Sequence, residues 1–380
     1  MTPRPAVLRP AVRPLIRPLV RPVLRTAAAL AAAGLLLTGC ATSGSSSTAA
    51  TRPATSAPAG TPADELRLGY FPNVTHATAV YGDAAGTFED ALDDGTTLTT
   101  QQFNAGPSAV EALFGGAIDA TYIGPNPAIN AFVKSRSEGG AIRIVAGATS
   151  GGASLVVRPG LDGPEDLRGT TLATPQTGGT QDIALRHYLA EHGYEVAASG
   201  AGDVTVLAQD NPVTLTAFQA GDVDGAWLPE PWASRLVLEA GAEVLVDERD
   251  LWPGGEFVTT HLIVRTDYLR EHPQTVRELV EGSVAANAAI TADPVAAREV
   301  VGSALAELTG KPLPPPVLER AFAGIRSTDD PVASSLATSA EHAFATGLVE
   351  EADLTGIYDL TLLREVLDTD VDDAGLGGSS

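Results

Sequence analysis

Short apolar runs alternate with segments of helical periodicity along most of the chain. In the first half, extended runs are expected over 66–70, 97–103, 118–123 and 142–148, with helical spacing of apolar residues between them. Such alternation is typical of a parallel sheet that carries helices on both faces. In these sheets ligands bind beyond the carboxyl ends of the strands.

A second series of the same kind follows. Its strands are expected over 171–174, 204–207, 224–227 and 244–246, and helices follow the first three. Two further extended runs separate the series, and we expect them to pair as crossing strands of a hinge; they are 155–158 and 257–265. From residue 266 onward the pattern is helical, and these helices are expected to brace the first domain.

The N-terminal pattern differs from the rest. Six arginines and no acidic residue lie within the first 25 positions, and an apolar run of 11 residues, 27–37, follows. That run is shorter than the roughly 20 residues needed to span a bilayer. The segment Leu37–Cys40 resembles a bacterial lipobox. We therefore expect a signal peptide over 1–39 and a lipid on Cys40, which would anchor an exported protein to the outer face of the cytoplasmic membrane.

The sequence thus predicts an α/β protein of two domains. Domain 1 comprises 64–152 and 250–368 with the C-terminal helices, and domain 2 comprises 153–249. Residues 40–63 are rich in Ser, Thr, Ala, Pro and Gly and are expected to form a flexible tether. Residues 369–380 are expected to form a disordered tail.

Charge and composition exclude several classes of function. The formal net charge of −23 argues against nucleic acid and against direct adsorption to anionic lipid. A single cysteine excludes an intramolecular disulfide, and the histidines lack the spacing of a metal site. No Ser/His/Asp order or carboxylate pair stands out. We expect neither a metal, nor a cofactor, nor an enzyme.

The loop 173–182 carries the most suggestive chemistry. A short strand runs through a proline turn and two glycines into a helix, whose first N–H groups lack intrahelical partners. Thr177, Thr180 and Gln181 add neutral donors, so the loop suits an anion. It is not a P-loop, because no Lys-Ser/Thr pair follows the glycines. An ordinary loop with a threonine cap is the alternative. If dipoles hold the anion, Arg186 should matter little.

Further candidates lie at the ends of the other predicted strands. The full set of candidate ligand-binding residues is Pro72, Asn73, His76, Asn104, Gly106, Pro107, Ser108, Tyr122, Gly124, Pro125, Asn126, Gln176, Thr177, Gly178, Gly179, Thr180, Gln181, Asn211, Trp227, Glu230 and Trp232.

Three kinds of side chain in this set have two readings each. His76 either contacts ligand or packs in a first helical turn. Trp227 and Trp232 either belong to the core or form an apolar wall for an alkyl or aryl tail of the ligand. Glu230 either caps the following helix or holds an ammonium or hydroxyl group of the ligand.

Several segments together resemble one protein family. They are Phe103–Pro107, Glu111–Leu113, Ala117–Asp119, Tyr122–Ala128, Leu167–Gly169, Ala173–Pro175, Asp222–Trp227 and Pro229–Trp232. Over 66–367 the chain resembles the substrate-binding lipoproteins of bacterial ABC importers in the nitrate, sulfonate and taurine group. The resemblance implies a type II periplasmic-binding-protein fold, with hinge strands, that closes like a clamp. It also implies that the protein passes its solute to permease and ATPase subunits, and we expect a monomer.

The ligand stays open at this point. An aliphatic sulfonate is expected first, because a permanent monoanion can be held by dipoles alone and still be released. Taurine and nitrate are alternatives within the resemblance. Phe71–Asn73 with His76 is similar to a segment of binders of hydroxymethylpyrimidine-type thiamine precursors. An enzyme on the same fold is the rival from another class.

Overall fold

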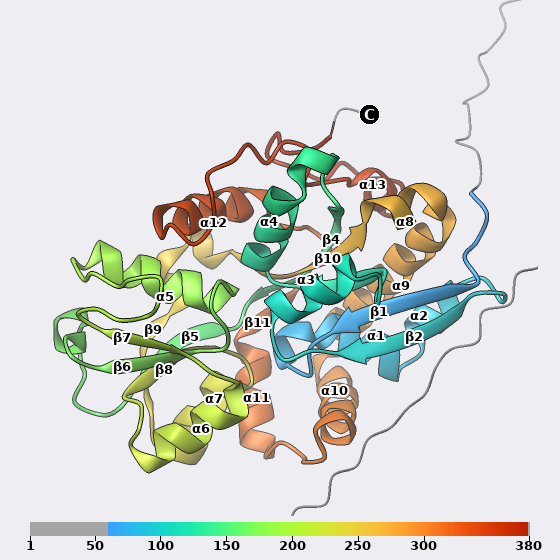
Figure 1. Ribbon diagram of the computed structural model, residues 1–380. Helices are drawn as coiled ribbons and strands as arrows, with labels where there is room; N and C mark the ends of the chain where they lie inside the picture. The colour runs from blue at the N-terminus through green and yellow to red at the C-terminus, as the bar shows by residue number, and fades with distance from the viewer. Residues whose placement is uncertain (1–59, 379–380) are drawn as a thin grey trace, which may run out of the picture. The chain divides into compact units, whose positions relative to one another are not determined.

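The computed structural model describes residues 60–378, which form two lobes, each built on its own β-sheet (Figure 1). We call the lobe with the six-stranded sheet the first lobe and the lobe with the five-stranded sheet the second lobe. The predicted signal peptide, Cys40 and the tether up to residue 59 lie outside the described residues. The exact domain boundaries stay a prediction.

The first sheet has the strand order β11-β4-β10-β3-β1-β2. Its strands are β1 (Glu65–Tyr70), β2 (Thr97–Gln102), β3 (Ala120–Ile123), β4 (Ile142–Gly151), β10 (Val258–Arg265) and β11 (Ile325–Ser327). β1 pairs in parallel with β2 and β3, whereas β10 lies antiparallel between β3 and β4. The expectation of a purely parallel sheet is wrong, because β10 returns from the second lobe and is inserted with the opposite direction.

The second sheet has the order β7-β6-β8-β5-β9. Its strands are β5 (Ala153–Val157), β6 (Thr171–Thr174), β7 (Thr205–Ala208), β8 (Gly225–Pro229) and β9 (Glu243–Asp247). β5 pairs antiparallel with β8 and β9. The expected pairing of 155–158 with 257–265 is therefore wrong: each run belongs to a different sheet, although the chain does cross between the lobes at both places.

Helices flank both sheets. The first lobe carries α1 (Ala77–Ala84), α2 (Thr87–Ala91), α3 (Gly106–Phe114), α4 (Pro125–Lys134), α8 (Thr266–Glu271), α9 (Pro273–Ala292), α10 (Pro294–Thr309), α11 (Pro315–Ala323), α12 (Ala333–Ala345) and α13 (Thr361–Leu367). The second lobe carries α5 (Thr180–Glu191), α6 (Asn211–Ala220) and α7 (Trp232–Ala240). α9 and α10 pack against α1, as expected for bracing helices, while α11 contacts α7 and α12 contacts α5 across the lobes.

The core of the second lobe shows why its sheet is covered on both faces. Along β5, Leu155 belongs to one buried cluster and Val156 to another. Along β8, Trp227 joins the cluster of Leu155, and Ala226 joins that of Val156. Successive side chains of a strand point to opposite faces, so both faces are apolar and both need a helical layer.

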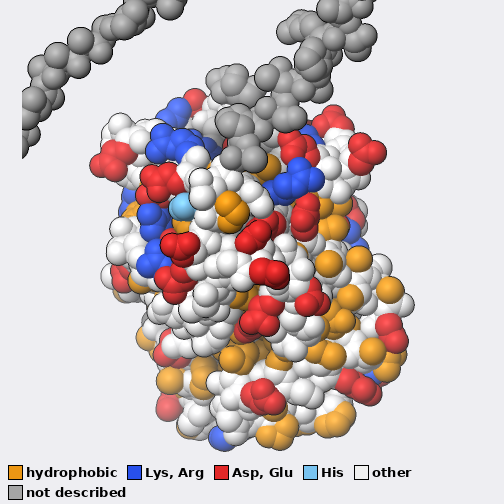
Figure 2. All heavy atoms as spheres, turned by 90° about the vertical axis from the view of Figure 1, so that its right-hand side faces the viewer, with side chains coloured by type: hydrophobic (Ala, Val, Ile, Leu, Met, Phe, Trp, Pro, Cys, Tyr) orange, Lys and Arg blue, Asp and Glu red, His pale blue; other side chains and the backbone are white. Residues whose placement is uncertain are grey.

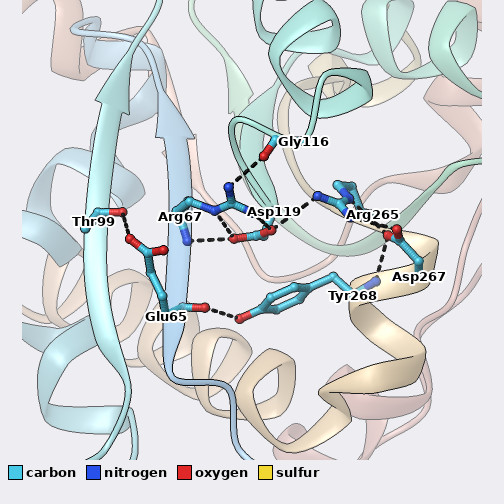
Figure 3. A network of polar contacts seen from close by, with 8 residues as sticks. All are labelled: Glu65, Arg67, Thr99, Gly116, Asp119, Arg265, Asp267 and Tyr268. Carbon is cyan, nitrogen blue, oxygen red and sulfur yellow. Dashed lines mark hydrogen bonds and ion pairs between the residues drawn. The ribbon is translucent and has the colours of Figure 1, made fainter. Parts of the chain in front are cut away.

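A buried carboxylate fastens the first sheet at the end opposite the carboxyl ends of its parallel strands (Figure 3). Asp119, 2% exposed, accepts hydrogen bonds from the Arg67 backbone N–H and guanidinium and lies 3.4 Å from the Arg265 guanidinium. These residues come from β1, β10 and the residue preceding β3. A charge this deeply buried is tolerated because it is paired and hydrogen-bonded.

The C-terminal segment is packed as far as the structure describes it, contrary to the expected disordered tail. Val371 is buried, and its carbonyl oxygen accepts a hydrogen bond of 2.6 Å from Arg364 Nη2. Tyr358 forms an isolated bridge with Gly377. An apolar side chain and a guanidinium partner hold this polar, glycine-rich segment in place.

The surface agrees with the acidic composition. Figure 2 shows acidic side chains spread over one face, with Lys and Arg in smaller groups among them. Between residues 60 and 378, no helix combines the length and apolar character needed to cross a bilayer.

Candidate ligand-binding site

A small cavity lies between the lobes, where the loops after β1, β2 and β3 face those after β6, β7 and β8. Ten predicted residues line it: Asn73, His76, Asn104, Gly106, Gly124, Gln176, Gly179, Thr180, Gln181 and Asn211. Its other lining residues are Phe71, Thr75, Ala105, Pro127, Pro175, Pro229 and Thr259. Space for the centres of water-sized spheres amounts to about 40 Å³, a few times what one water needs by that measure.

Four helices begin at this cavity, two from each lobe. They are α3 and α4 in the first lobe, and α5 and α6 in the second. Proline occupies the first turn of α3, α4 and α6 and removes N–H donors there, whereas α5 has none. The N–H groups of Thr180, Gln181 and Asp182 have no acceptor among the described residues. α5 therefore presents three free N–H donors in a proline-free first turn, together with the positive end of its dipole.

Two buried polar atoms at the cavity have no hydrogen-bond partner within residues 60–378. They are Thr180 Oγ1 and Asn211 Oδ1, on side chains only 7% and 5% exposed. The threonine hydroxyl does not cap α5, because the N-cap residue is Gly179. The alternative of an ordinary loop with a threonine cap is therefore wrong. An unsatisfied buried polar atom costs about 1–3 kcal/mol. Both atoms are therefore available to a ligand.

His76 both packs and faces the cavity. Its Nδ1 accepts a hydrogen bond of 3.3 Å from the Phe71 N–H, and the two rings lie 4.2 Å apart. Burial lowers the pKa of His76 to about 3, so the ring is neutral near pH 7. With Nδ1 accepting, the proton of the neutral ring resides on Nε2, which can donate to a ligand.

No Lys, Arg, Asp or Glu is among the described residues that line the cavity. Asp182 in the first turn of α5 is fully buried and accepts from the Gly178 N–H at 2.9 Å. It also pairs with Arg186 at 3.0 Å. The charges of this pair offset each other beside the cavity, and neither side chain lines it.

Glu230 caps the following helix. Its carboxylate accepts from the Ser234 N–H at 3.1 Å and from the Ser234 hydroxyl at 2.9 Å, in the first turn of α7. Burial raises the pKa of Glu230 above its usual value. Of the two hypotheses for Glu230, the structure agrees with the helix cap.

Three predicted residues lie elsewhere. Tyr122 is buried in the first core and donates to Ser283 Oγ at 2.9 Å. Asn126 Nδ2 donates to the Ser339 carbonyl oxygen at 3.1 Å. Trp227 is fully buried in the second lobe and donates to Glu248 Oε2 at 2.7 Å. These side chains point into the layers behind the loops, because neighbouring positions on a strand or helix face different ways.

The remaining candidates border the cavity without lining it. Pro72 and Trp232 line an adjoining groove. The same loops and helix starts contain five further candidates that are not part of the wall: Pro107, Ser108, Pro125, Thr177 and Gly178. Ser108 Oγ, for example, donates to the Ala105 carbonyl oxygen at 2.8 Å.

Thr259 is a wall residue that the sequence reasoning missed. It lies near the amino end of β10, and its hydroxyl donates to the Gly151 carbonyl oxygen. In an antiparallel strand the amino end meets the carboxyl ends of its neighbours. Recognising β10 as antiparallel would have been the only signal for this residue.

Contacts between the lobes enclose the cavity. Trp232 Nε1 of the second lobe donates to Asn73 Oδ1 of the first at 2.9 Å. A Cβ atom added to Gly124 would clash with Thr180 Oγ1, so these two residues meet closely. The structure thus has the lobes closed against each other at this point.

A family model described as the NMT1-like family matches residues 59–305. The chain belongs to this family. The periplasmic taurine-binding protein of Escherichia coli K12 is 28% identical over 217 residues, which cover 57% of this chain and 64% of that protein. The match thus spans less than two thirds of that relative's length.

Solved structures similar to this NMT1-like chain confirm the predicted fold. The alkanesulfonate-binding protein SsuA from Xanthomonas axonopodis pv. citri, bound to MOPS, aligns with a TM-score of 0.63 and 23% identity, covering 77% of this chain and 96% of that one. A ligand-binding component of an ABC-type import system from Staphylococcus aureus aligns with 0.66 and 16%, covering 80% and 99%. The homologues include taurine-, aliphatic sulfonate- and nitrate-binding periplasmic proteins, which confirms the resemblance to that group, while the lipid anchor stays a prediction.

Proposed function

We propose that this NMT1-like chain is the extracytoplasmic ligand-binding component of an ABC importer and captures a small organic anion, an aliphatic sulfonate first. The observation that carries the proposal is the neutral cavity at four helix N-termini, with the unpaired Thr180 hydroxyl as a further donor in its wall. Three sulfonate oxygens accept hydrogen bonds from free N–H groups, the Thr180 hydroxyl and His76 Nε2. The resemblance to taurine- and sulfonate-binding proteins agrees with this.

The absence of a full counter-charge favours a monoanion that must be released again. Buried charges attract strongly at low dielectric, and a guanidinium partner would hold the ligand more firmly than helix dipoles do. A sulfonate stays ionised at all relevant pH values. The cavity therefore needs no proton uptake to bind it or to let it go.

Taurine fits less well than a simple alkanesulfonate. The described wall offers its ammonium group no carboxylate, because Glu230 is engaged by Ser234. The unpaired Asn211 Oδ1 can accept from the ammonium but does not neutralise its charge. Desolvating an unpaired ammonium is costly. We expect ethanesulfonate to bind at least about tenfold more tightly than taurine.

We further propose that the protein has no catalytic activity on its ligand. His76 is the titratable side chain of the described wall, and a pKa of about 3 makes it a poor general base near pH 7. Catalysis would be revealed by a new product in the mass spectrum after incubation with each candidate.

Calorimetry with ethanesulfonate, taurine, nitrate and a hydroxymethylpyrimidine tests the ligand class. Ethanesulfonate should bind most tightly and release no product. Tight binding of the pyrimidine together with no binding of any anion would reject the proposal. A preference for nitrate would keep the anion site and reject the sulfonate.

Binding is proposed to close the lobes about the two crossing segments. Gly151, the last residue of β4, and Gly152, which precedes β5, have φ values of 79° and 80°, a conformation that glycine adopts without strain. The second crossing segment runs from 248 to 257. Ligand should therefore lower the radius of gyration in solution scattering, and an unchanged value at saturation would remove closure from the mechanism.

The anchor and the partners complete the proposal. Acylation of Cys40 needs its thiol, so Cys40→Ser should leave an unlipidated full-length precursor in a native host. A wild-type protein that keeps its first 39 residues there would contradict the signal-peptide prediction. We propose that the lipid-anchored monomer delivers its ligand to permease and ATPase subunits.

A further inference from the structure

An apolar groove adjoins the ligand cavity. It is lined from the first lobe by the loops after β1 and β2 and by the end of α10, and from the second lobe by α6 and α7. Besides several prolines, its apolar side chains are Phe103, Leu215, Trp232, Leu305, Leu308 and Leu313. The space inside it is about 800 Å³, against about 40 Å³ in the cavity.

The groove and the cavity share a wall. Asn73, Asn104 and Asn211 line both spaces. Asn211 Oδ1 has no hydrogen-bond partner in the described chain, and Asn73 is held by Trp232 Nε1. The boundary includes these neutral amide side chains, which can reorient about their side-chain bonds.

The groove also leaves apolar surface without a partner. Leu308 at the end of α10 is 37% exposed, and the partly buried Leu313 also lines the groove, whereas Leu305 is buried in the first-lobe core. Three charged residues, Arg235, Glu239 and Lys311, line the groove. Arg235 and Glu239 pair with each other at 3.0 Å, and the Arg235 guanidinium stacks over the Trp232 ring. An apolar surface of this kind next to a ligand site typically contacts a ligand or a partner.

We propose that the groove receives the hydrocarbon tail of a sulfonate whose head lies in the cavity. The cavity holds the space of only a few waters and so takes the head group, while the groove beyond the three asparagines offers room and apolar contacts for the tail. The ligand class would then be long-chain alkanesulfonates. This inference rests on the proposed function.

Tail length is the variable that tests it. Calorimetry of the full-length protein with methane-, butane- and octanesulfonate should give affinities that rise along the series. A fully buried methylene corresponds to about a fourfold gain, and a half-exposed one to about twofold. We therefore expect octanesulfonate to bind at least about 100-fold more tightly than methanesulfonate.

A matched pair of variants on α6 locates the tail. Thr216 is exposed and lines the groove, whereas Val213, one turn earlier and also exposed, does not. Thr216→Trp should fill the groove and remove about tenfold or more of the octanesulfonate affinity, with methanesulfonate unchanged within twofold. Val213→Trp should alter neither.

Each outcome separates the two proposals. Equal affinities along the series, or equal losses for both ligands in Thr216→Trp, would overturn the tail groove and leave the sulfonate head site intact. Such a result would leave the groove as a surface for another protein. If no member of the series bound, the proposed function and the tail groove would both be rejected.

Discussion

Replacing Thr180 by valine should change affinity and stability in opposite directions. Thr180 Oγ1 is buried at the cavity and has no partner within the described residues. Valine keeps the shape and removes the hydroxyl. In the free protein the variant no longer buries an unsatisfied polar atom, whereas in the complex it lacks one hydrogen bond to the ligand.

The magnitudes follow from the two states. Relief of the orphaned hydroxyl should raise the free energy of unfolding by up to about 1 kcal/mol, the low end of the range for such groups. A hydrogen bond to a charged acceptor contributes about 1.5–3 kcal/mol, so the dissociation constant for ethanesulfonate should rise about 10- to 150-fold. Urea unfolding of the ligand-free protein and calorimetry measure the two effects.

Thr149→Val is the matched control. Thr149 Oγ1 is also buried without a partner in the described chain, but Thr149 lies in β4 and does not line the cavity. This variant should be as stable as Thr180→Val, or nearly so, and should bind ethanesulfonate like the wild type. If Thr180→Val kept wild-type affinity, the hydroxyl would not contact the ligand and the anion position would have to be sought elsewhere in the cavity.

Three further outcomes test closure, ionisation and the sheet. Gly124→Ala places its Cβ against Thr180 Oγ1, so calorimetry should show at least tenfold weaker sulfonate binding. In a Thr180→Ala background the same change should reduce the affinity less. If the losses of affinity of the two single variants simply added in the double variant, closure of the lobes at this contact would be contradicted. Burial lowers the pKa of His76 from 6.5 to about 3, so the unfolded chain gains a proton that the folded protein does not, and stability falls by up to about 1.4 kcal/mol per pH unit below pH 6.5. Burial raises the pKa of Glu248 to about 7, so between pH 7 and 4.5 the folded protein binds a proton that the unfolded chain does not, and this raises stability as the pH falls. Glu248→Gln should therefore increase the loss of stability between pH 7 and pH 5, measured as the difference between the urea midpoints. An unchanged difference would contradict this. Asp119→Asn should lower the free energy of unfolding by about 3 kcal/mol and leave sulfonate affinity unaltered, because Asp119 lies at the far end of the sheet; weaker binding would link the two ends (Figure 3).

Local patterns were enough to find most strands and helices. The strand predicted over 171–174 coincides with β6, and the helix expected after it is α5. The alternation of strand and helix therefore sufficed for the α/β class. It could not give the direction of β10, because strand direction in a sheet depends on where the chain returns from, and that is a long-range property.

The site was predictable where it depended on loop position, and less so where it depended on side-chain direction. Asn73, His76 and Thr180 follow strands and line the cavity. Trp227 and Trp232 are five positions apart, yet one is fully buried in the second core and the other lines the groove. Which way an aromatic ring turns is decided by packing against α5 and α6, and neither residue type nor spacing contains that information.

Arg186 illustrates how a charge outside the wall still bears on an anion site. The expectation that it should matter little considered only direct contact, and Arg186 indeed does not line the cavity. It is buried and pairs with Asp182, whose carboxylate lies in the first turn of the helix that faces the ligand. Alone, that carboxylate would repel an anion and compete for the positive end of the helix dipole. The ion pair therefore keeps the neighbourhood neutral, so the free N–H groups of α5 remain available to hold a ligand that has no counter-charge of its own.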